Sequence, residues 1–361
     1  MSGALFETVR FVTNTLDCKP RIAYVEFTGT FDQNTGTGDF GMDALSDVLR
    51  TVCLKGGVFL HAEFSEPWCL GVKVQSESCA SFLGQNSDVI PYHYVVDGRL
   101  RIQEIDGPVH EIETGGLALL PRNDYHLLGG DLGLPPIPSA EVVHPPARGG
   151  LATIRLGGEG AQTRIVCGFL AGENLQSNPV VSALPTVLCL DYRGDSSSEW
   201  IRNTFSYAAD EIAAGRMGSE TVFAKLSELL FVEAIRRYAE SLPEGHTGWL
   251  AGLRDPFVSR ALALLHARPG DPWTVEALGQ EVGLSRSALT DRFTHVMGVS
   301  PMQYLAGWRI QLAAQELLNT NKSIPRIAQD IGYETESAFS RAFKRRMGAP
   351  PGTWRQRHRS V

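Results

Sequence analysis

The C-terminal third of the chain repeats one pattern of apolar and polar positions. In each copy a hydroxyl side chain precedes apolar residues at helical spacing, a glycine follows, and a second apolar pair recurs at i, i+4. Each glycine suits the left-handed conformation that ends a helix and turns the chain. The expected caps are Thr274 and Ser285 in the first copy and Ser323 and either Thr335 or Ser337 in the second, with Gly283 and Gly332 at the turns. The pattern predicts two helix-turn-helix units, whose second helices are of the kind that enters a major groove.

Residues 300–320 join the two copies and show an unbroken helical pattern with Pro301 at the first helical position. About 19 residues of helix span about 28 Å. Successive major-groove faces on one side of B-DNA lie about 34 Å apart, so a rigid helix of this length can hold both second helices against the same side of the duplex. A plain helical bundle is the alternative, but a duplicated unit with a fitting spacer is harder to produce by chance than one motif.

Residues 43–195 show a different pattern, in which short β-like runs alternate with turns. About eight such runs follow one another at close spacing, which is typical of an antiparallel sandwich or barrel. Residues 127–150 are rich in proline and glycine, which predicts a long irregular loop across the barrel. That loop either closes over a ligand or is a solvated insertion. The runs are 56–64, 69–75, 92–98, 99–107, 109–122, 151–158, 163–172 and 179–192.

Helical patterns return after the β-like region. A first helix is expected from Ser198 to near Gly215 or Gly218, and a second covers 219–241. The second contains the apolar run 229–232, which is wider than one helical stripe, so two of its faces need cover. One face is expected to pack on the barrel and the other on the same helix of a second subunit, which makes a homodimer. A helix buried wholly within the monomer is the alternative.

Two stretches of the C-terminal third are distinctive. The linking helix contains GWRIQLAAQELL, and the second copy reads SIPRIAQDIGYETESAFSRAFKRRMGAPP. With these motifs the last hundred residues closely resemble the arabinose-operon (AraC/XylS) family of bacterial transcription regulators. The resemblance implies a sequence-specific regulator of transcription that binds double-stranded DNA. One departure is Asp291, where the family usually carries a basic or neutral residue; a carboxylate there repels phosphate unless it accepts from a cytosine amino group or pairs with Arg292.

The outward faces of the two second helices supply the candidate DNA contacts. Arg286 and Arg341 are the candidates for reading guanine edges, whereas Lys344, Arg345 and Arg346 are expected to neutralise phosphates. The alternative for these late basic residues is a solvated helix end, because positive charge is favourable at a helix C-terminus whatever it touches. The full set of candidates is Arg286, Ser287, Thr290, His295, Thr335, Glu336, Ser340, Arg341, Lys344 and Arg345.

Two stretches of the β-like region are also distinctive, YHYVVDG at 92–98 and GGLALLPRNDYH at 115–126. They resemble the two core motifs of the cupin jelly roll, and residues 43–195 resemble the cupin-type sensor domain found in many regulators. Asn123 stands where cupins usually have glycine, an exchange that the left-handed conformation tolerates. The resemblance implies a barrel that binds a small-molecule effector. The candidates for lining or rimming its pocket are His61, Trp68, His93, Arg122 and His126.

Cupin enzymes typically hold a metal with a His-x-His pair, a Glu and a later His. Here His126 stands at the later position, but His93 is alone in its strand and no His-x-His pair precedes Tyr92. A lone strand histidine is more often a hydrogen-bonded structural residue than a ligand. We therefore expect no metal, no cofactor and no catalytic residue. The alternatives are a cupin-type metal enzyme with a DNA-binding tail and a regulator whose barrel is only a scaffold.

The charge of the chain is informative only when the chain is divided. The 361 residues carry a formal charge of −7, which by itself argues against a nucleic-acid partner. Residues 251–361, however, hold 15 Lys and Arg against 9 Asp and Glu, which leaves 18 against 31 for residues 1–250. The positive charge is thus concentrated where the helix-turn-helix pattern lies.

The six cysteines show no CxxC pair and no zinc-ligand spacing, which fits reduced thiols in a cytoplasm. Apolar neighbours favour core packing for Cys167 and Cys189. The N-terminus lacks a signal-peptide pattern, and no apolar run approaches membrane-spanning length. We expect a cytoplasmic protein without a membrane partner.

The predicted fold class is α+β, with an N-terminal cupin-like β jelly roll plus helices and a C-terminal all-α double helix-turn-helix domain. The predicted divisions are an extension of unassigned role (1–42), the cupin-like sensor domain (43–195), a helical dimerisation segment (196–242), a linker (243–254) and the DNA-binding domain (255–361).

Overall fold

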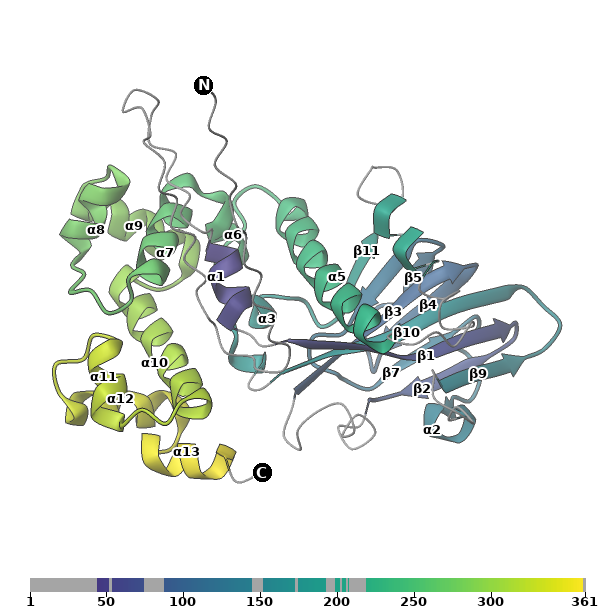
Figure 1. The fold of residues 1–361 in the computed structure, drawn as a ribbon. Helices are drawn as coiled ribbons and strands as arrows, with labels where there is room; N and C mark the ends of the chain where they lie inside the picture. The colour runs from purple at the N-terminus through teal and green to yellow at the C-terminus, as the bar shows by residue number, and fades with distance from the viewer. Residues whose placement is uncertain are drawn as a thin grey trace, which may run out of the picture. The chain divides into compact units, whose positions relative to one another are not determined.

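The computed structural model describes residues 44–51, 54–74, 88–144, 152–172, 175–192, parts of 199–207, and 219–359. The predicted extension 1–42 lies outside the described residues, and so does much of the helix expected after Ser198. The described residues form a β-rich part followed by a helical part (Figure 1). The α+β fold class predicted from the sequence is confirmed.

The β-rich part consists of two sheets whose inner faces share one hydrophobic core. The larger sheet has the strand order β11-β6-β3-β10-β1-β9 and the smaller has the order β5-β4-β7-β2-β8. Strands are paired antiparallel except for β1 with β9 and β2 with β8. The bounds are β1 (Lys55–Ser65), β2 (Cys69–Val72), β3 (Asp88–Asp97), β4 (Arg99–Glu104), β5 (His110–Glu113), β6 (Gly116–Leu119), β7 (His126–Gly129), β8 (Ile137–Pro138), β9 (Ala152–Gly157), β10 (Gln162–Gly172) and β11 (Leu188–Asp191).

The central strand β3 is buried on both faces because its alternate residues face different cores. Val95 faces the space between the sheets. Tyr92 and Tyr94 face the other way, into a core that includes residues of helix α5 (Ser219–Ser241), which lies along the larger sheet (Figure 1). A buried hydrogen bond of 2.7 Å between the hydroxyls of Tyr92 and Ser227 joins strand and helix. The helix expected at 219–241 therefore covers one face of the barrel.

Residues 179–192 do not form one strand, contrary to the prediction. Pro179–Ser182 forms helix α3, and only Leu188–Asp191 forms a strand. The side chain of Asn178 caps α3 by accepting from the backbone N–H of Val180 at 2.8 Å, and the proline follows at the first helical position. Both are helix-starting signals, and they prevail over the β-branched residues that favour a strand.

Residues 127–150 are not irregular throughout, contrary to the prediction. They contain most of β7, all of β8 and the short helix α2 (Ser139–Val142). The strand β7 pairs with both β2 and β4, so its conformation is set by its neighbours and not by its own composition. Pro138 is accommodated because β8 is an edge strand, where a missing N–H is tolerated. Helix α1 (Ala44–Thr51), before the first strand, is not predicted from the sequence either.

The helical part contains both predicted helix-turn-helix units, α8–α9 and α11–α12. Gly283 and Gly332 have φ angles of 79° and 84°, so both turn glycines are left-handed as predicted. Two helices are not predicted, α13 and α6, and α6 lies within the predicted linker 243–254. The bounds are α6 (Trp249–Arg254), α7 (Pro256–Ala267), α8 (Val275–Val282), α9 (Arg286–Met297), α10 (Pro301–Asn319), α11 (Ile324–Asp330), α12 (Glu336–Met347) and α13 (Pro351–Arg359).

The linking helix α10 contributes to the cores of both units. Near its start, Leu305 packs with Leu289 and Phe293 of the first unit. Nearer its end, Leu317 packs with Phe343 of the second unit. The two units therefore have separate hydrophobic cores, and α10 contributes to both.

Candidate functional site

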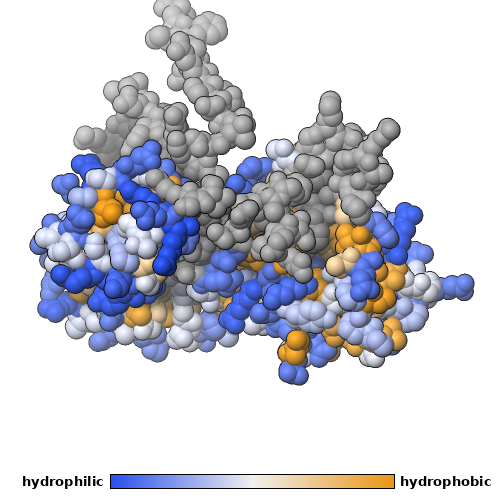
Figure 2. All heavy atoms as spheres, turned by 90° about the horizontal axis from the view of Figure 1, so that it is seen from below, coloured by the Kyte–Doolittle hydropathy of each residue, from blue (hydrophilic) through white to orange (hydrophobic). Residues whose placement is uncertain are grey.

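The second helix of each unit exposes one face. In α9, Leu289 and Phe293 are fully buried, and in α12, Phe339 and Phe343 are fully buried. The opposite faces meet solvent, and the helical part is mainly hydrophilic on the side shown in Figure 2. Of the ten predicted DNA contacts, Thr290 and Ser340 are half-buried, and the exposed ones are Arg286, Ser287, His295, Thr335, Glu336, Arg341, Lys344 and Arg345.

Two of the predicted contact hydroxyls already have roles within their own helices. Thr335 Oγ1 accepts from the backbone N–H of Ala338 at 3.2 Å and caps α12, as predicted. Thr290 Oγ1 donates to the carbonyl of Arg286 at 2.8 Å. Thr335 Oγ1 also lies 3.3 Å from Ser337 Oγ, where either hydroxyl can donate, and Thr290 has used its donor.

The first unit holds its arginines in ion pairs from neighbouring helices. Arg286 Nη1 lies 2.7 Å from Glu276 Oε1 of α8. Arg292 Nε lies 2.7 Å from Asp255 Oδ2, so Arg292 pairs with Asp255 and not with Asp291, the partner considered from the sequence. Asp291 itself is exposed. Since both groups of the Arg286 pair are more than half exposed, the pair orients the guanidinium without adding much stability.

The second unit concentrates positive charge at the end of its second helix, α12. Lys344, Arg345 and Arg346 occupy the last turn of α12, and Arg341 lies about one turn earlier on its exposed face. Basic residues in the last turn complement the negative end of the helix macrodipole. Four cations on about two turns also form the kind of surface that tracks a phosphate backbone.

A buried hydrogen-bonded chain lies between the sheets of the barrel. His93 Nε2 lies 3.0 Å from His126 Nε2, and His93 Nδ1 lies 3.0 Å from Cys167 Sγ. His126 Nδ1 lies 2.9 Å from the carbonyl oxygen of Asp124, which can only accept. The proton order follows: Cys167 donates to His93, His93 donates to His126, and His126 donates to Asp124. All four ring nitrogens are satisfied with both imidazoles neutral.

Burial keeps this chain uncharged. Desolvation lowers the pKa of His126 to about 4, although the nearby Asp124 carbonyl opposes the shift. Desolvation also lowers the pKa of His93 well below its usual value, and the neighbouring His126 adds to that effect. Burial raises the pKa of the Cys167 thiol, so the group stays a thiol. The sequence predicts core packing for Cys167, but its contact with His93 arises from strand register, which pairs the two residues.

The five residues predicted to bind a ligand are distributed over different surroundings. His93 and His126 meet in the chain just described, and Trp68 stacks on Phe64 in the same core with ring centroids 3.7 Å apart. His61 lies on β1 between residues that face this core, so its side chain points to the opposite face. Arg122 is exposed in the turn before β7. Asn123 beside it has a φ of 53°, which confirms the predicted left-handed conformation.

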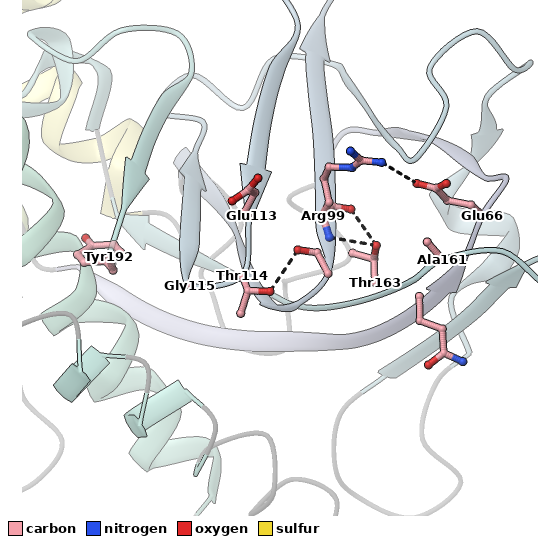
Figure 3. A pocket seen from close by; sticks show the side chains of 10 residues that line it. Glu66, Arg99, Glu113, Thr114, Gly115, Ala161, Thr163 and Tyr192 are labelled. Atoms are coloured by element: carbon pink, nitrogen blue, oxygen red, sulfur yellow. Dashed lines mark hydrogen bonds and ion pairs between the residues drawn. The ribbon is translucent and has the colours of Figure 1, made fainter. Parts of the chain in front are cut away.

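A pocket of about 460 Å³ lies at one end of the barrel, where the turns β3–β4 and β5–β6 meet the start of β10 (Figure 3). Arg99 Nη2 lies 3.7 Å from Glu66 Oε1, and Thr163 Oγ1 donates to the Arg99 carbonyl at 2.8 Å. None of the five predicted ligand residues lines this pocket, although the two cupin-like stretches border it through Gly98 and Gly115. Its lining residues are Glu66, Gly98, Arg99, Glu113, Thr114, Gly115, Ala161, Gln162, Thr163 and Tyr192.

Comparison with known proteins assigns similarity to both parts of the chain. The family model described as Cupin matches residues 43–240, and the model described as Helix-turn-helix domain matches residues 278–357. A putative AraC-like transcription regulator of Streptomyces lividans is 32% identical over 258 residues, which cover 72% of this chain and 83% of that protein. Among the described residues, no helix is both long and apolar enough to cross a bilayer.

Two further relatives match nearly their whole length. The HTH-type transcriptional regulator AlkR of Acinetobacter baylyi is 28% identical over 87% of this chain and 99% of its own. The RCS-specific HTH-type transcriptional activator RclR of Escherichia coli is 24% identical over 89% of this chain and 99% of its own. Both alignments therefore extend over the β-rich part and the helix-turn-helix part of this chain.

Because its buried imidazoles stay neutral, we expect the folded protein to lose stability in mild acid. The unfolded chain takes up protons near pH 6.5, whereas folded His126 and His266, whose pKa values burial lowers to about 4, stay neutral. The stability that these neutral imidazoles contribute is therefore fully present above pH 6.5. As the pH drops toward 4, the free energy of unfolding falls by up to about 1.4 kcal/mol per pH unit for each imidazole. Urea unfolding of the wild type between pH 5 and 8 measures this slope.

The variant His126→Gln provides the control for that slope. It removes one buried imidazole, so its free energy of unfolding should fall less steeply with acid than that of the wild type. Equal slopes for the two proteins would show that His126 is not held neutral by the fold.

Proposed function

This chain belongs to the AraC-like transcription regulators that join a cupin domain to a helix-turn-helix domain, and we propose how it binds DNA, what controls it and how it assembles. It is a DNA-binding transcriptional regulator. In our proposal α9 and α12 enter two major-groove segments on one side of the duplex. The supporting observation is the single 19-residue helix α10, which joins two capped helix-turn-helix units. We place the site of action in a bacterial cytoplasm, where the DNA is.

The second unit supplies the stronger contacts in this proposal. Arg341 lies on α12, whose N-cap is Thr335, and its long side chain is exposed. Such a side chain suits bidentate contact with a guanine. Lys344 and Arg345 bind phosphates. In the first unit, the carboxylate of Glu276 must release Arg286 or share it when a guanine is read. Asp291 favours a cytosine amino group, because it has no cation from Arg292 to neutralise it.

We propose no catalytic activity for the barrel. The His93 and His126 nitrogens are all used in hydrogen bonds within the buried chain. Their role in the proposal is structural: a satisfied polar chain fixes the register of the strands that carry it.

The Arg341→Ala variant tests the DNA-binding proposal. Selection of sites from random double-stranded DNA by the full-length protein should yield one two-part site. Arg341→Ala should weaken binding to that site by about 1–3 kcal/mol and relax the preference at one base pair. Lys344→Ala, the matched control on the same helix, should weaken binding to all sequences alike. It should also lower the slope of log affinity against log salt concentration by about one, because one phosphate contact is lost. A wild type that selects no site, or an Arg341→Ala protein with unchanged preference, contradicts the proposal.

The proposed effector site is the pocket at the end of the barrel. Two carboxylates, Glu66 and Glu113, line it with one guanidinium, Arg99, and two hydroxyl residues, Thr114 and Thr163 (Figure 3). This lining favours a small molecule with hydroxyl or amine groups over an anion. The core between the sheets, in contrast, is filled by apolar side chains and the imidazole chain.

Thermal-shift measurements with polar metabolites test the effector proposal. A ligand that raises the melting temperature of the wild type should have a weaker effect on Glu113→Gln, because the variant keeps the shape of the pocket and loses a charge. The control Glu141→Gln alters an exposed carboxylate of α2 that does not line the pocket. A ligand that shifts all three proteins equally binds elsewhere.

The proposed homodimer forms through the outer face of α5. Leu230 and Phe231 are buried under the helix, whereas Leu229 is 44% and Val222 46% exposed. These two residues lie seven positions apart, so they share one exposed stripe. Two copies of such a stripe can pack in a twofold contact, because the same surface serves both subunits.

The Leu229→Glu variant tests the dimer. A charge at this position would be buried in the twofold contact without a partner, so the variant should sediment as a monomer at concentrations where the wild type is a dimer. Thr221→Glu adds the same charge at another exposed position of α5 and should remain dimeric. A wild-type monomer, or two variants that behave alike, contradicts the α5 interface.

A further inference from the structure

Arg309 lies in the middle of α10, between the residues that pack in the first core and those that pack in the second. Its guanidinium donates to three backbone carbonyls: Nε to Pro269 at 2.7 Å, Nη2 to Asp271 at 2.7 Å and Nη1 to Gly332 at 3.2 Å. The first two carbonyls belong to the loop between α7 and α8. The third belongs to the turn between α11 and α12. One side chain thus fastens a loop of each unit to the helix that joins them.

The two loops also touch each other directly. A Cβ added to Gly270 would lie 2.7 Å from the carbonyl oxygen of Asp330. A Cβ added to Gly332 would lie 2.6 Å from the carbonyl oxygen of Gly270 and 2.7 Å from Arg309 Nη2. Only glycines on both sides permit this approach. The equivalent turn glycine of the first unit, Gly283, has the same left-handed backbone, but a Cβ added there would meet no neighbouring atom within 4 Å.

The loop of the first unit is itself well ordered by hydrogen bonds. Trp273 Nε1 donates to the carbonyl of Arg268 at 2.9 Å, and the N–H of Asp271 donates to the same carbonyl at 3.3 Å. The guanidinium of Arg268 stacks over the Trp273 ring at 4.6 Å. The carbonyls offered to Arg309 are therefore presented by a rigid loop.

The position of the guanidinium is electrostatically favourable. The loop follows the end of α7, and Gly332 follows the end of α11, so Arg309 lies near the C-terminal ends of two helices. Unpaired carbonyls at helix ends carry partial negative charge and attract cations. Partial burial lowers the pKa of the guanidinium, and the nearby Tyr333 and Asp271 oppose that shift.

We infer that Arg309 is a positioning residue that fixes the spacing and relative rotation of the two recognition helices, and hence the half-site spacing that the protein accepts on DNA. This inference rests on the proposed function, in which α9 and α12 both read the duplex. The two units have separate cores and share α10. The junction of Arg309 with the two loops adds a second connection, so the units cannot turn about α10 independently.

The expected consequence is strict spacing. Inserting one base pair between half-sites rotates one by about 34–36° and moves it by about 3.4 Å. The wild type, with both units fixed, should lose on the order of tenfold in affinity for such a site, as it would for a mismatched base pair. Arg309→Gln cannot reach three carbonyls, so it should bind the selected site more weakly than the wild type does. Its affinity should fall less than about threefold when one base pair is inserted between the half-sites. Arg309→Lys, with its charge but no planar fork, should fall between them.

The glycine pair supplies a matched control. Gly332→Ala and Gly283→Ala carry the same backbone strain, but only the first pushes the two loops and Arg309 apart. Gly332→Ala should tolerate the inserted base pair as Arg309→Gln does, while Gly283→Ala should keep the strict spacing of the wild type. This comparison remains informative if Arg309→Gln fails to fold.

The measurement is the affinity of each full-length protein for the selected site, for the same site with one base pair inserted or deleted, and for each half-site alone. Unchanged half-site affinities with relaxed spacing in Arg309→Gln and Gly332→Ala support the inference. Variants that weaken binding but keep the wild-type ratio between spacings overturn it, because the residues would then serve stability only. A wild type that selects no two-part site refutes the proposed function itself, which is a distinguishable result.

Discussion

The DNA-binding part depends on one helix that contributes to the cores of both units. Leu305 anchors the start of α10 in the first unit and Leu317 anchors its later turns in the second, so neither unit is complete without the shared helix. A helix is stiff along its axis. The 19 residues of α10 span about 28 Å, and this length sets how far apart the two recognition helices can lie. An axis alone does not fix rotation around it. The backbone contacts at Gly270 and Gly332, and the guanidinium that bridges them, supply that second constraint.

The barrel is organised by a similar principle on a smaller scale. His93, His126 and Cys167 come from three strands, and their hydrogen bonds form only when all three strands are in register. A buried polar chain is stable only if each donor finds an acceptor, so a slip of one residue would leave several groups unsatisfied. The same chain occupies part of the space where a cupin could hold a ligand. The pocket that we propose for an effector instead lies at the end of the barrel, bounded by Glu66, Arg99 and Glu113.

The sequence predicts what is encoded locally. Caps such as Thr274, turn glycines such as Gly283 and the α10 proline lie within a few residues of what they control, and all are confirmed. Helix α3 is missed although its starting signals, Asn178 and Pro179, are local. Other misses come from contact between distant segments. Arg292 pairs with a residue 37 positions away, Arg309 reaches 40 positions back to Pro269, and Cys167 meets a histidine 74 positions away. Likewise β7 is a strand because β2 and β4 flank it. The predicted contact residues on α9 and α12 stay predictions, since the fold shows only that most are exposed.

The distribution of charge along the chain explains why the relative position of the two helix-turn-helix units matters for DNA binding. Non-specific affinity for DNA comes mainly from cations that displace counterions, and its strength rises with the number of phosphates neutralised. Here the helix-turn-helix part is positive, but the whole chain carries a formal charge of −7, and the excess of carboxylates lies in residues 1–250. Those carboxylates add no attraction to the duplex, and any that lie within about a Debye length of it oppose binding to every sequence alike. Affinity must then come from contacts that form together at one site. Two units whose spacing is fixed in advance lose less conformational freedom on binding than two units that turn independently. Rigidity at the α10 junction therefore makes the free energy of binding more favourable, which offsets part of the weaker electrostatic attraction.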